Sequence, residues 1–231
     1  MSRSRSTVAQ LERAALADAL LAAGRDAPTL CEGWTALDLA AHVVIRERRP
    51  DSLPGLVVPP LGGWTEAVLR RERRHGLPAL AMAIRSGPPW WSPFALPGVD
   101  ENGNLMEMLI HHEDVRRGRG AGPREAGVTL DAVEEAVWRS MASAQGRMRL
   151  LRAGTGVVLR RTPRGVDPGS PGVGLGEVVA RRARRGQPTV TISGAPIELA
   201  LYAFGRRGAA RVALIGPEEG IRRITGAKLR A

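Results

Sequence analysis

The sequence predicts an α+β fold in which a helical N-terminal half, residues 1–150, precedes a small α/β unit, residues 151–231. Two patterns lead to this prediction. Apolar residues recur at helical spacing through much of the first half, beginning with residues 7–23. After Leu151, short stretches of alternating polarity and Gly/Pro-rich connections replace that spacing. A chain of 231 residues with 43% hydrophobic residues is long and apolar enough to build both parts.

The first half is expected to form a series of helices separated by turn residues. The first helix covers residues 7–23 and ends at Gly24. The second follows Thr35, a suitable N-cap residue, with Asp38 three residues later in a variant of the capping box. The spans expected for the second and later helices are 36–49, 64–85 with a kink or break near Gly76 and Pro78, 104–118, and 129–147.

A long connection rich in Pro, Gly and Trp covers residues 86–103. Loops of this length inside a compact domain are usually functional or disordered. The aromatic residues Trp90, Trp91 and Phe94 argue against disorder. Two interpretations stay open, because these side chains would serve equally well to cover the mouth of a pocket or to cap the end of the helices.

The second half is expected to combine three strands with two short helices. Residues 188–193 alternate in polarity as a half-buried strand does. The segment GAPIELALYAFGR begins a short helix with Pro196 in its first turn, and Pro217 opens the last helix. The strands are expected at residues 156–162, 188–193 and 211–216.

The chain is strongly basic, with 34 Lys and Arg residues against 23 Asp and Glu and a net charge of +11. Nearly all of the basic residues are arginine. The clusters at 70–74 and 181–185 lack interleaved aromatic residues on which single-stranded nucleic acid would stack. No zinc-finger spacing and no RNA-binding signature is present. The composition therefore favours an arginine-rich solvated surface over nucleic-acid binding, which steep salt dependence would reveal.

The single cysteine, Cys31, excludes a disulfide within the chain and is typical of a reducing compartment. The N-terminal apolar residues are interrupted by Glu12, Arg13 and Asp18, so they form neither a signal peptide nor a membrane span. A cytoplasmic protein that does not enter a membrane is expected.

Three residues on two predicted helices form a candidate metal site. Glu107 and His111 are four residues apart, which places both side chains on one helix face at about 5–6 Å between Cβ atoms. His42 lies in an apolar stretch of another helix. If the two helices are neighbours, two imidazoles and one carboxylate would meet, which is a common catalytic zinc set and also suits iron or nickel. The spacing alone favours ordinary packing and helix salt bridges over a metal site.

Several neighbouring residues are weaker candidates. His112 points about 100° away from His111 around the helix. Asp114 is placed to orient a histidine ligand or, alternatively, to pair with nearby arginines. Cys31 is a conceivable thiol nucleophile, although packing of a small loop residue is the simpler interpretation. His75, within an arginine-rich segment, is expected to be exposed.

Two segments around these residues resemble the mycothiol-dependent maleylpyruvate isomerase family, which is part of the DinB-like metal-binding superfamily. The segment CEGWTALDLAAHVVIRERRPD is similar to the family segment that supplies a histidine ligand, here His42. NLMEMLIHHEDVRRG is similar to the segment that supplies a Glu and a His, here Glu107 and His111. TVTISGAPIELALYAFGR resembles the family's small C-terminal domain. The closest likeness is to a branch of metal-binding proteins without a described function. The positions that match the first motif are Cys31, Gly33, Trp34, Thr35, Asp38, Leu39 and His42.

This resemblance implies a DinB-like four-helix bundle with zinc at one end, followed by a sterol-carrier-like α/β domain. It also implies a mycothiol-like thiol cofactor that the metal holds as a thiolate. Arg206 becomes a candidate for binding an anionic substrate or a carboxylate of the thiol, with a surface arginine as the alternative. Asp114, His112 and Arg206 are therefore the candidate catalytic groups.

The predicted function is a zinc-dependent, thiol-dependent isomerase or S-transferase acting on a small electrophilic molecule. The alternative is a non-catalytic metal-binding regulator or ligand carrier. An open coordination position facing a pocket would favour the enzyme, and a closed one the structural role. The sequence leaves the substrate, the thiol and the oligomeric state open.

Overall fold

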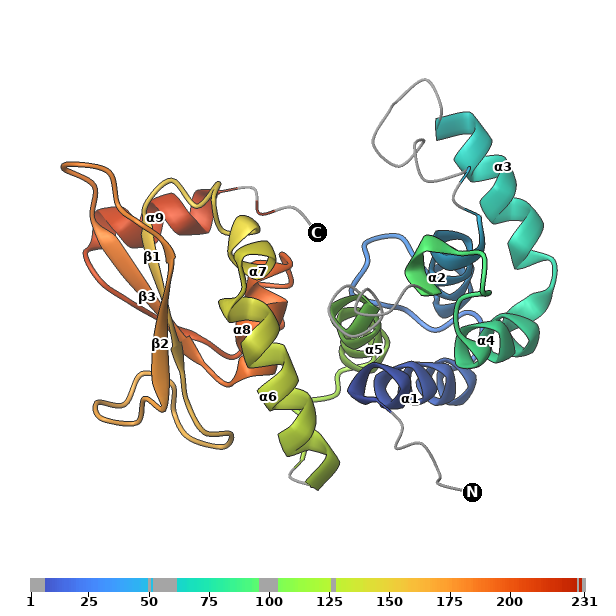
Figure 1. Ribbon diagram of the computed structural model, residues 1–231, viewed down its shortest axis with the longest axis horizontal. Helices are drawn as coiled ribbons and strands as arrows, with labels where there is room; N and C mark the ends of the chain where they lie inside the picture. Colours follow the sequence, from blue (N-terminus) through green and yellow to red (C-terminus); the bar gives the residue numbers. More distant parts are fainter. Residues whose placement is uncertain are drawn as a thin grey trace. The chain divides into compact units, whose positions relative to one another are not determined.

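The computed structural model combines helices with one β-sheet, which confirms the α+β class (Figure 1). The chain divides into two compact units, Met1–Gly122 and Pro123–Ala231. None of the helices in the described part of the chain is long and apolar enough to cross a bilayer. The described residues are 7–49, 51, 62–95, 104–125, 128–227 and 229.

The first unit is helical, and capping boxes fix where its first two helices begin. Thr7 caps α1 with Gln10, and Thr35 caps α2 with Asp38, as the sequence predicted for the second helix. The expected third helix is two helices, α3 and α4, because the backbone at Gly76 has a φ of 77° that interrupts the helical path. The helices are α1 (Val8–Ala23), α2 (Ala36–Arg48), α3 (Gly62–Arg73), α4 (Gly76–Ser86) and α5 (Leu105–Gly118).

The core of the first unit forms where α1 packs against α4 and α5, and α2 packs against α3 and α4. Leucine, valine, isoleucine and alanine fill it, and Leu16, Leu39 and Ile84 are fully buried. One ion pair is also buried here, between Arg13 of α1 and Glu47 of α2, with 2.7 Å between Nη1 and Oε2. The helix that carries His42 is therefore held in a rigid core.

The connection predicted at residues 86–103 is described only as far as Ala95, and residues 96–103 lie outside the described residues. It contains the short 3-10 helix η3, Pro93–Ala95. Trp90 is 90% exposed and Trp91 is half exposed, so neither packs into the core. Phe94 instead packs beneath the guanidinium of Arg46, whose carbon lies 4.3 Å from the ring centre.

The second unit consists of one four-stranded sheet and its helices. The strand order is β2-β1-β3-β4, with β1 and β3 parallel and the other pairs antiparallel. Figure 1 shows α6, α7 and α8 on one face of this sheet. The elements are α6 (Val128–Ala142), α7 (Ala144–Met148), β1 (Gly156–Arg161), β2 (Gly176–Arg181), β3 (Thr189–Gly194), α8 (Pro196–Ala203), β4 (Ala213–Ile215) and α9 (Glu218–Gly226).

Two features of the second unit differ from the sequence prediction. Strand β2 was not expected, because it is an edge strand in which only Ala180 is buried and no alternation marks it. The division between the units falls at Gly122 and Pro123 rather than near residue 150, because α6 packs on α8. Helical periodicity reveals that α6 has a buried face, but it does not reveal which element covers that face.

Candidate metal centre

The side chains of His42, Glu107 and His111 meet within the first unit. His42 comes from α2, and Glu107 and His111 lie one turn apart on α5. Each offers a ligand atom within 4.8 Å of the other two. Glu107 Oε1 lies 3.6 Å from His42 Nε2 and 3.1 Å from His111 Nε2. The structure thus brings together the three residues on which the sequence prediction depends.

The two separations between the Glu107 oxygen and the imidazole nitrogens are close to those of ligands on one tetrahedral metal ion. Zinc bonds to imidazole nitrogen and carboxylate oxygen are about 2.0–2.1 Å long, so two ligand atoms on one ion lie about 3.3–3.4 Å apart. The distances of 3.1 and 3.6 Å bracket this value. Two imidazoles and one carboxylate suit zinc, and also iron or nickel. The donor set therefore fits a divalent metal, without selecting one.

Local packing sets the orientation of His42. The capping box at Thr35 starts α2 directly after Trp34, whose ring lies 5.0 Å from the His42 ring. The ring of His111 crosses it nearly edge-on, at 5.4 Å and 78°. His42 Nδ1 is buried and has no hydrogen-bond partner among the described residues. Burial lowers the pKa of His42, which favours the neutral imidazole that binds metals.

Asp114 orients the second histidine. Its Oδ2 lies 3.0 Å from His111 Nδ1, and the carboxylate is completely buried. Cys31, which is half-buried, donates its Sγ–H to the same oxygen at 3.2 Å. Arg116 and Arg117, the alternative partners considered for Asp114, both pair with Glu113. A carboxylate on the far nitrogen of an imidazole is a common arrangement behind metal-binding histidines, because it fixes the tautomer.

The electrostatics of the cluster favour a positive charge between its carboxylates. Burial alone would raise the pKa of Glu107, but hydrogen bonds with His111 and His42 hold it well below its usual value. Burial likewise opposes charge on His111, yet hydrogen bonds with Asp114, Cys31 and Glu107 raise the pKa of His111 well above its usual value. Both shifts have the direction expected where two carboxylates face an imidazole in a buried cluster.

Arg46 is part of the same site, and the sequence analysis did not single it out. Its Nε lies 3.5 Å from Glu107 Oε1, and its Nη1 donates to Asn104 Oδ1 at 2.9 Å. Asn104 in turn donates to the carbonyl of Phe94 at 3.2 Å. Arg46 follows His42 by four residues, which places both on one face of α2. The four-residue spacing from His42 is the sequence signal that could have identified Arg46.

The remaining candidates lie elsewhere. His112 faces α1, where its Nδ1 lies 3.2 Å from Glu12 Oε2. Arg206 belongs to the second unit and donates from Nη1 to the carbonyl of Phe204 at 2.8 Å. His75 is exposed, as expected. Asp38 has the capping role predicted for it, and its carboxylate also pairs with Arg73 of α3 at 2.7 Å. Asp38 does not belong to the group of candidate metal ligands formed by His42, Glu107 and His111.

No protein-family model matches the sequence, and no curated protein matches it either. Two solved structures are similar to the chain, each over 90% of both chains. One is the crystal structure of the mycothiol-dependent maleylpyruvate isomerase, with 21% sequence identity and a TM-score of 0.46. The other is a histidine-to-alanine mutant of that isomerase, with 20% identity and a TM-score of 0.46.

Proposed function

We propose that this protein binds one divalent metal ion, with zinc the first choice, through His42, Glu107 and His111, and catalyses a thiol-dependent isomerisation or S-transfer on a small electrophilic molecule. The observation that carries the proposal is the convergence of these three donors from two helices, with Glu107 Oε1 at 3.6 Å and 3.1 Å from the two imidazole nitrogens. The sequence resemblance of the segments around them to mycothiol-dependent isomerases supports the thiol requirement.

When bound, the metal would act as a Lewis acid and lower the pKa of a coordinated thiol, so that the thiol would react as a thiolate at neutral pH. The protein residues prepare the site for this chemistry. Asp114 holds His111 Nδ1 and thereby directs Nε2 toward Glu107. Arg46 holds the Glu107 carboxylate and adds a positive charge to the site, which suits an anionic group on the substrate or the thiol.

The proposal also includes the fold families of the two units and the roles of the other candidate residues. We propose that the first unit is a DinB-like bundle and the second a sterol-carrier-like domain. Asp114 is proposed as a positioning residue, and His112 as a residue that ties α5 to α1 through Glu12. Arg206 is proposed to bind an anionic group, and its replacement by Gln should then raise KM more than it lowers kcat. The partners would be a low-molecular-weight, mycothiol-like thiol and a small substrate in the cytoplasm.

Absorption spectroscopy of the cobalt-loaded protein tests the proposal. Cobalt(II) in a tetrahedral site absorbs visible light, and a thiolate on the metal adds an intense charge-transfer band in the near ultraviolet. We expect the visible bands in the wild type and in His75→Ala, the exposed-histidine control, but not in His42→Ala. Addition of a small thiol such as 2-mercaptoethanol should then produce the charge-transfer band.

The two steps of this experiment separate the candidate functions. Absence of tetrahedral cobalt bands in the wild type would contradict the metal site itself. Tetrahedral bands that no thiol alters would retain the metal site and contradict the thiol-dependent enzyme, which would leave the non-catalytic metal-binding protein as the better description.

A further inference from the structure

Residues 28–34, part of the connection between α1 and α2, lie directly against α5, and we call them the 28–34 segment. The backbone N–H of Leu30 donates to the carbonyl of Asp114 at 3.0 Å. A Cβ atom at Gly118 would lie 2.5 Å from Cα of Thr29, so only a glycine permits this close approach. The segment is therefore fixed against the helix that carries two of the three candidate metal ligands.

Hydrogen bonds inside the 28–34 segment hold the backbone of Cys31. Its N–H donates to Thr29 Oγ1 at 3.2 Å, and its carbonyl accepts a hydrogen bond from the N–H of Trp34 at 2.9 Å. The hydroxyl of Thr29 also donates to the carbonyl of Trp34 at 2.9 Å. Because both polar backbone groups of Cys31 are bonded within the segment, the segment determines where the thiol lies.

The thiol of Cys31 is connected to a candidate metal ligand through one carboxylate oxygen. Asp114 Oδ2 accepts the Sγ–H of Cys31 at 3.2 Å and lies 3.0 Å from His111 Nδ1. The other ring nitrogen of His111, Nε2, lies 3.1 Å from Glu107 Oε1. Asp114 is completely buried and His111 is 7% exposed, so contacts with the protein position both side chains. A second donor on Oδ2 restricts the rotation of the carboxylate that orients the imidazole.

Two simpler roles for Cys31 fit these contacts less well. Reactive cysteines usually lie beside positive charges or at helix N-termini, whereas the sulfur of Cys31 faces the carboxylate of Asp114. Packing alone would require only a side chain of similar size. It would not require a donor directed at the same oxygen that holds His111.

We propose that Cys31 is a positioning residue of the candidate metal centre, in which its S–H fixes the Asp114 carboxylate and thereby holds the ring of His111 with Nε2 toward Glu107. This inference rests on the proposed function, because it assigns a further residue to the same metal centre. A thiol is a weak hydrogen-bond donor, so the effect of Cys31 on metal affinity should be smaller than that of Asp114.

Nuclear magnetic resonance of the metal-free protein, with nitrogen-15 in its four histidines, tests the proposal without a metal. We expect a resolved Nδ1–H signal from the buried ring of His111. Cys31→Ala should shift this signal and accelerate its exchange with water by about two- to tenfold, as the loss of one hydrogen bond would. Cys31→Ser retains a donor and should restore the signal. Ser86→Ala, which removes a hydroxyl donor outside the centre, is the control.

Zinc affinity, measured by competition with a chelator, connects the ring position to metal binding. Cys31→Ala should lower the affinity by about two- to tenfold without changing the stoichiometry. Cys31→Ser should bind zinc more tightly than Cys31→Ala does. Cys31→Val fills the space without a donor and should behave like Cys31→Ala, which separates the hydrogen bond from packing. Cys31→Val also answers the question if Cys31→Ala fails to fold.

Three results would overturn the proposal. The first is a wild-type His111 signal in both Cys31→Ala and Cys31→Val. The second is wild-type zinc affinity in these two variants. The third is loss of turnover in Cys31→Ser with an unchanged His111 signal and unchanged zinc affinity, which would make Cys31 a nucleophile. If the wild type binds no metal, the proposed function fails, whereas the His111 signal still decides whether Cys31 positions that ring.

Discussion

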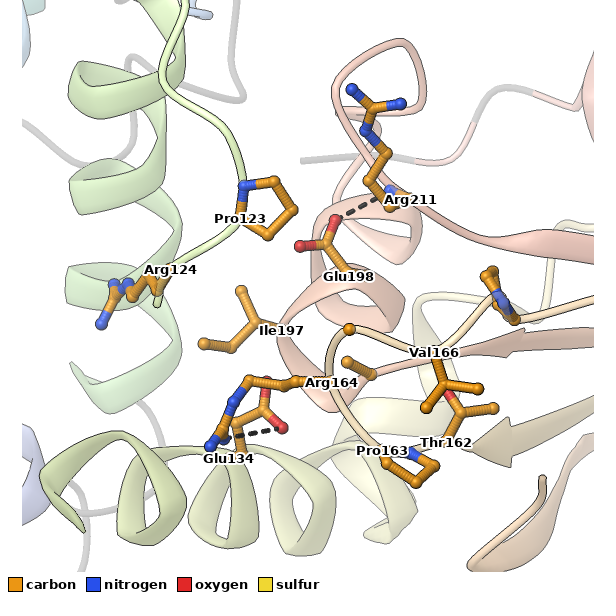
Figure 2. Close-up of a pocket in the computed structure, with 13 residues that line it drawn as sticks. Pro123, Arg124, Glu134, Thr162, Pro163, Arg164, Val166, Ile197, Glu198 and Arg211 are labelled. Atoms are coloured by element: carbon orange, nitrogen blue, oxygen red, sulfur yellow. Dashed lines mark hydrogen bonds and ion pairs between the residues drawn. The ribbon is translucent and has the colours of Figure 1, made fainter. Parts of the chain in front are cut away.

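The candidate metal centre and a pocket of the second unit between α6 and α8, which we call the α6–α8 pocket (Figure 2), both contain buried carboxylates, but they are assembled in different ways. The metal centre takes its three donors from two helices, and two of the donors lie one turn apart on α5. The α6–α8 pocket collects its residues from several separate segments between residues 123 and 211. In the candidate metal centre imidazoles face Glu107, whereas in the pocket Glu134 faces the guanidinium of Arg164.

This difference explains which site a sequence can reveal. A pair of ligands at spacing of four residues leaves a recognisable pattern, because the geometry of one helix fixes their distance. A pocket built from distant segments leaves none, because the tertiary fold alone brings its walls together. Each of the following variants tests one side of this difference, and the variant with the largest expected change comes first.

Replacement of Glu107 by Gln should abolish stoichiometric metal binding, because it removes the only carboxylate ligand and leaves two imidazoles beside Arg46. Isothermal titration calorimetry with zinc measures the binding, and Glu66→Gln on α3 is the control. Stoichiometric zinc binding retained in Glu107→Gln would contradict the assignment of Glu107 as a ligand.

Replacement of Asp114 by Asn should weaken metal affinity by about 10–100-fold while preserving the stoichiometry. The reason is that Asp114 does not bind the metal in this proposal but fixes the ring of His111. A competition assay with a chelator gives the affinity, and Asp18→Asn on α1 serves as the exposed control. Affinity equal to that of the wild type would remove Asp114 from the account of the site.

Loss of the buried ion pair between Arg13 and Glu47 should reduce stability strongly. Glu47→Ala removes the buried carboxylate that lies 2.7 Å from the guanidinium of Arg13, and we expect a loss of about 3–5 kcal/mol in the free energy of unfolding. The exposed pair between Arg160 and Glu177 provides the comparison, since Glu177→Ala should cost less than about 1 kcal/mol. Denaturant unfolding monitored by circular dichroism measures both, and equal losses would be inconsistent with the burial of the first pair.

The pH dependence of stability should report the carboxyl group in the α6–α8 pocket. Burial raises the pKa of Glu134 in the folded state, so the folded protein binds this proton more tightly than the unfolded chain does. The stabilisation is fully present below the unfolded pKa and is lost as the pH rises through the folded pKa. Glu134→Gln should remove this loss, so the stability of the variant should fall less than that of the wild type as the pH rises through this range. Parallel stability curves for the two proteins from pH 4 to pH 7 would contradict the assignment.

Local patterns anticipated much of the first unit and of its site. The capping box at Thr35, the helix break at Gly76 and the spacing of Glu107 and His111 are all properties of short segments. Arg46 was overlooked although it has the same four-residue spacing to His42, because an arginine near an expected metal ligand does not match a ligand pattern. Its role depends on Asn104 and Phe94, which the sequence places far from it.

The second unit was harder to predict, for physical reasons that particular elements illustrate. Edge strand β2 buries only Ala180, so it lacks the alternation that marked β3. Helix α6 has a clear apolar face, but its packing on α8 is a tertiary contact that periodicity does not encode. No local pattern distinguishes Glu134 and Glu198 from surface carboxylates. The fold buries both of them in the wall of the pocket.

The ratio of metal to protein, measured by inductively coupled plasma mass spectrometry after zinc loading and gel filtration, tests the central claim most directly. We predict about one zinc per chain for the wild type and for the exposed-histidine control His75→Ala, and almost none for His42→Ala. Absence of zinc from the wild type after loading, or equal zinc in His42→Ala, would contradict the account and make His42, Glu107 and His111 a hydrogen-bonded packing cluster.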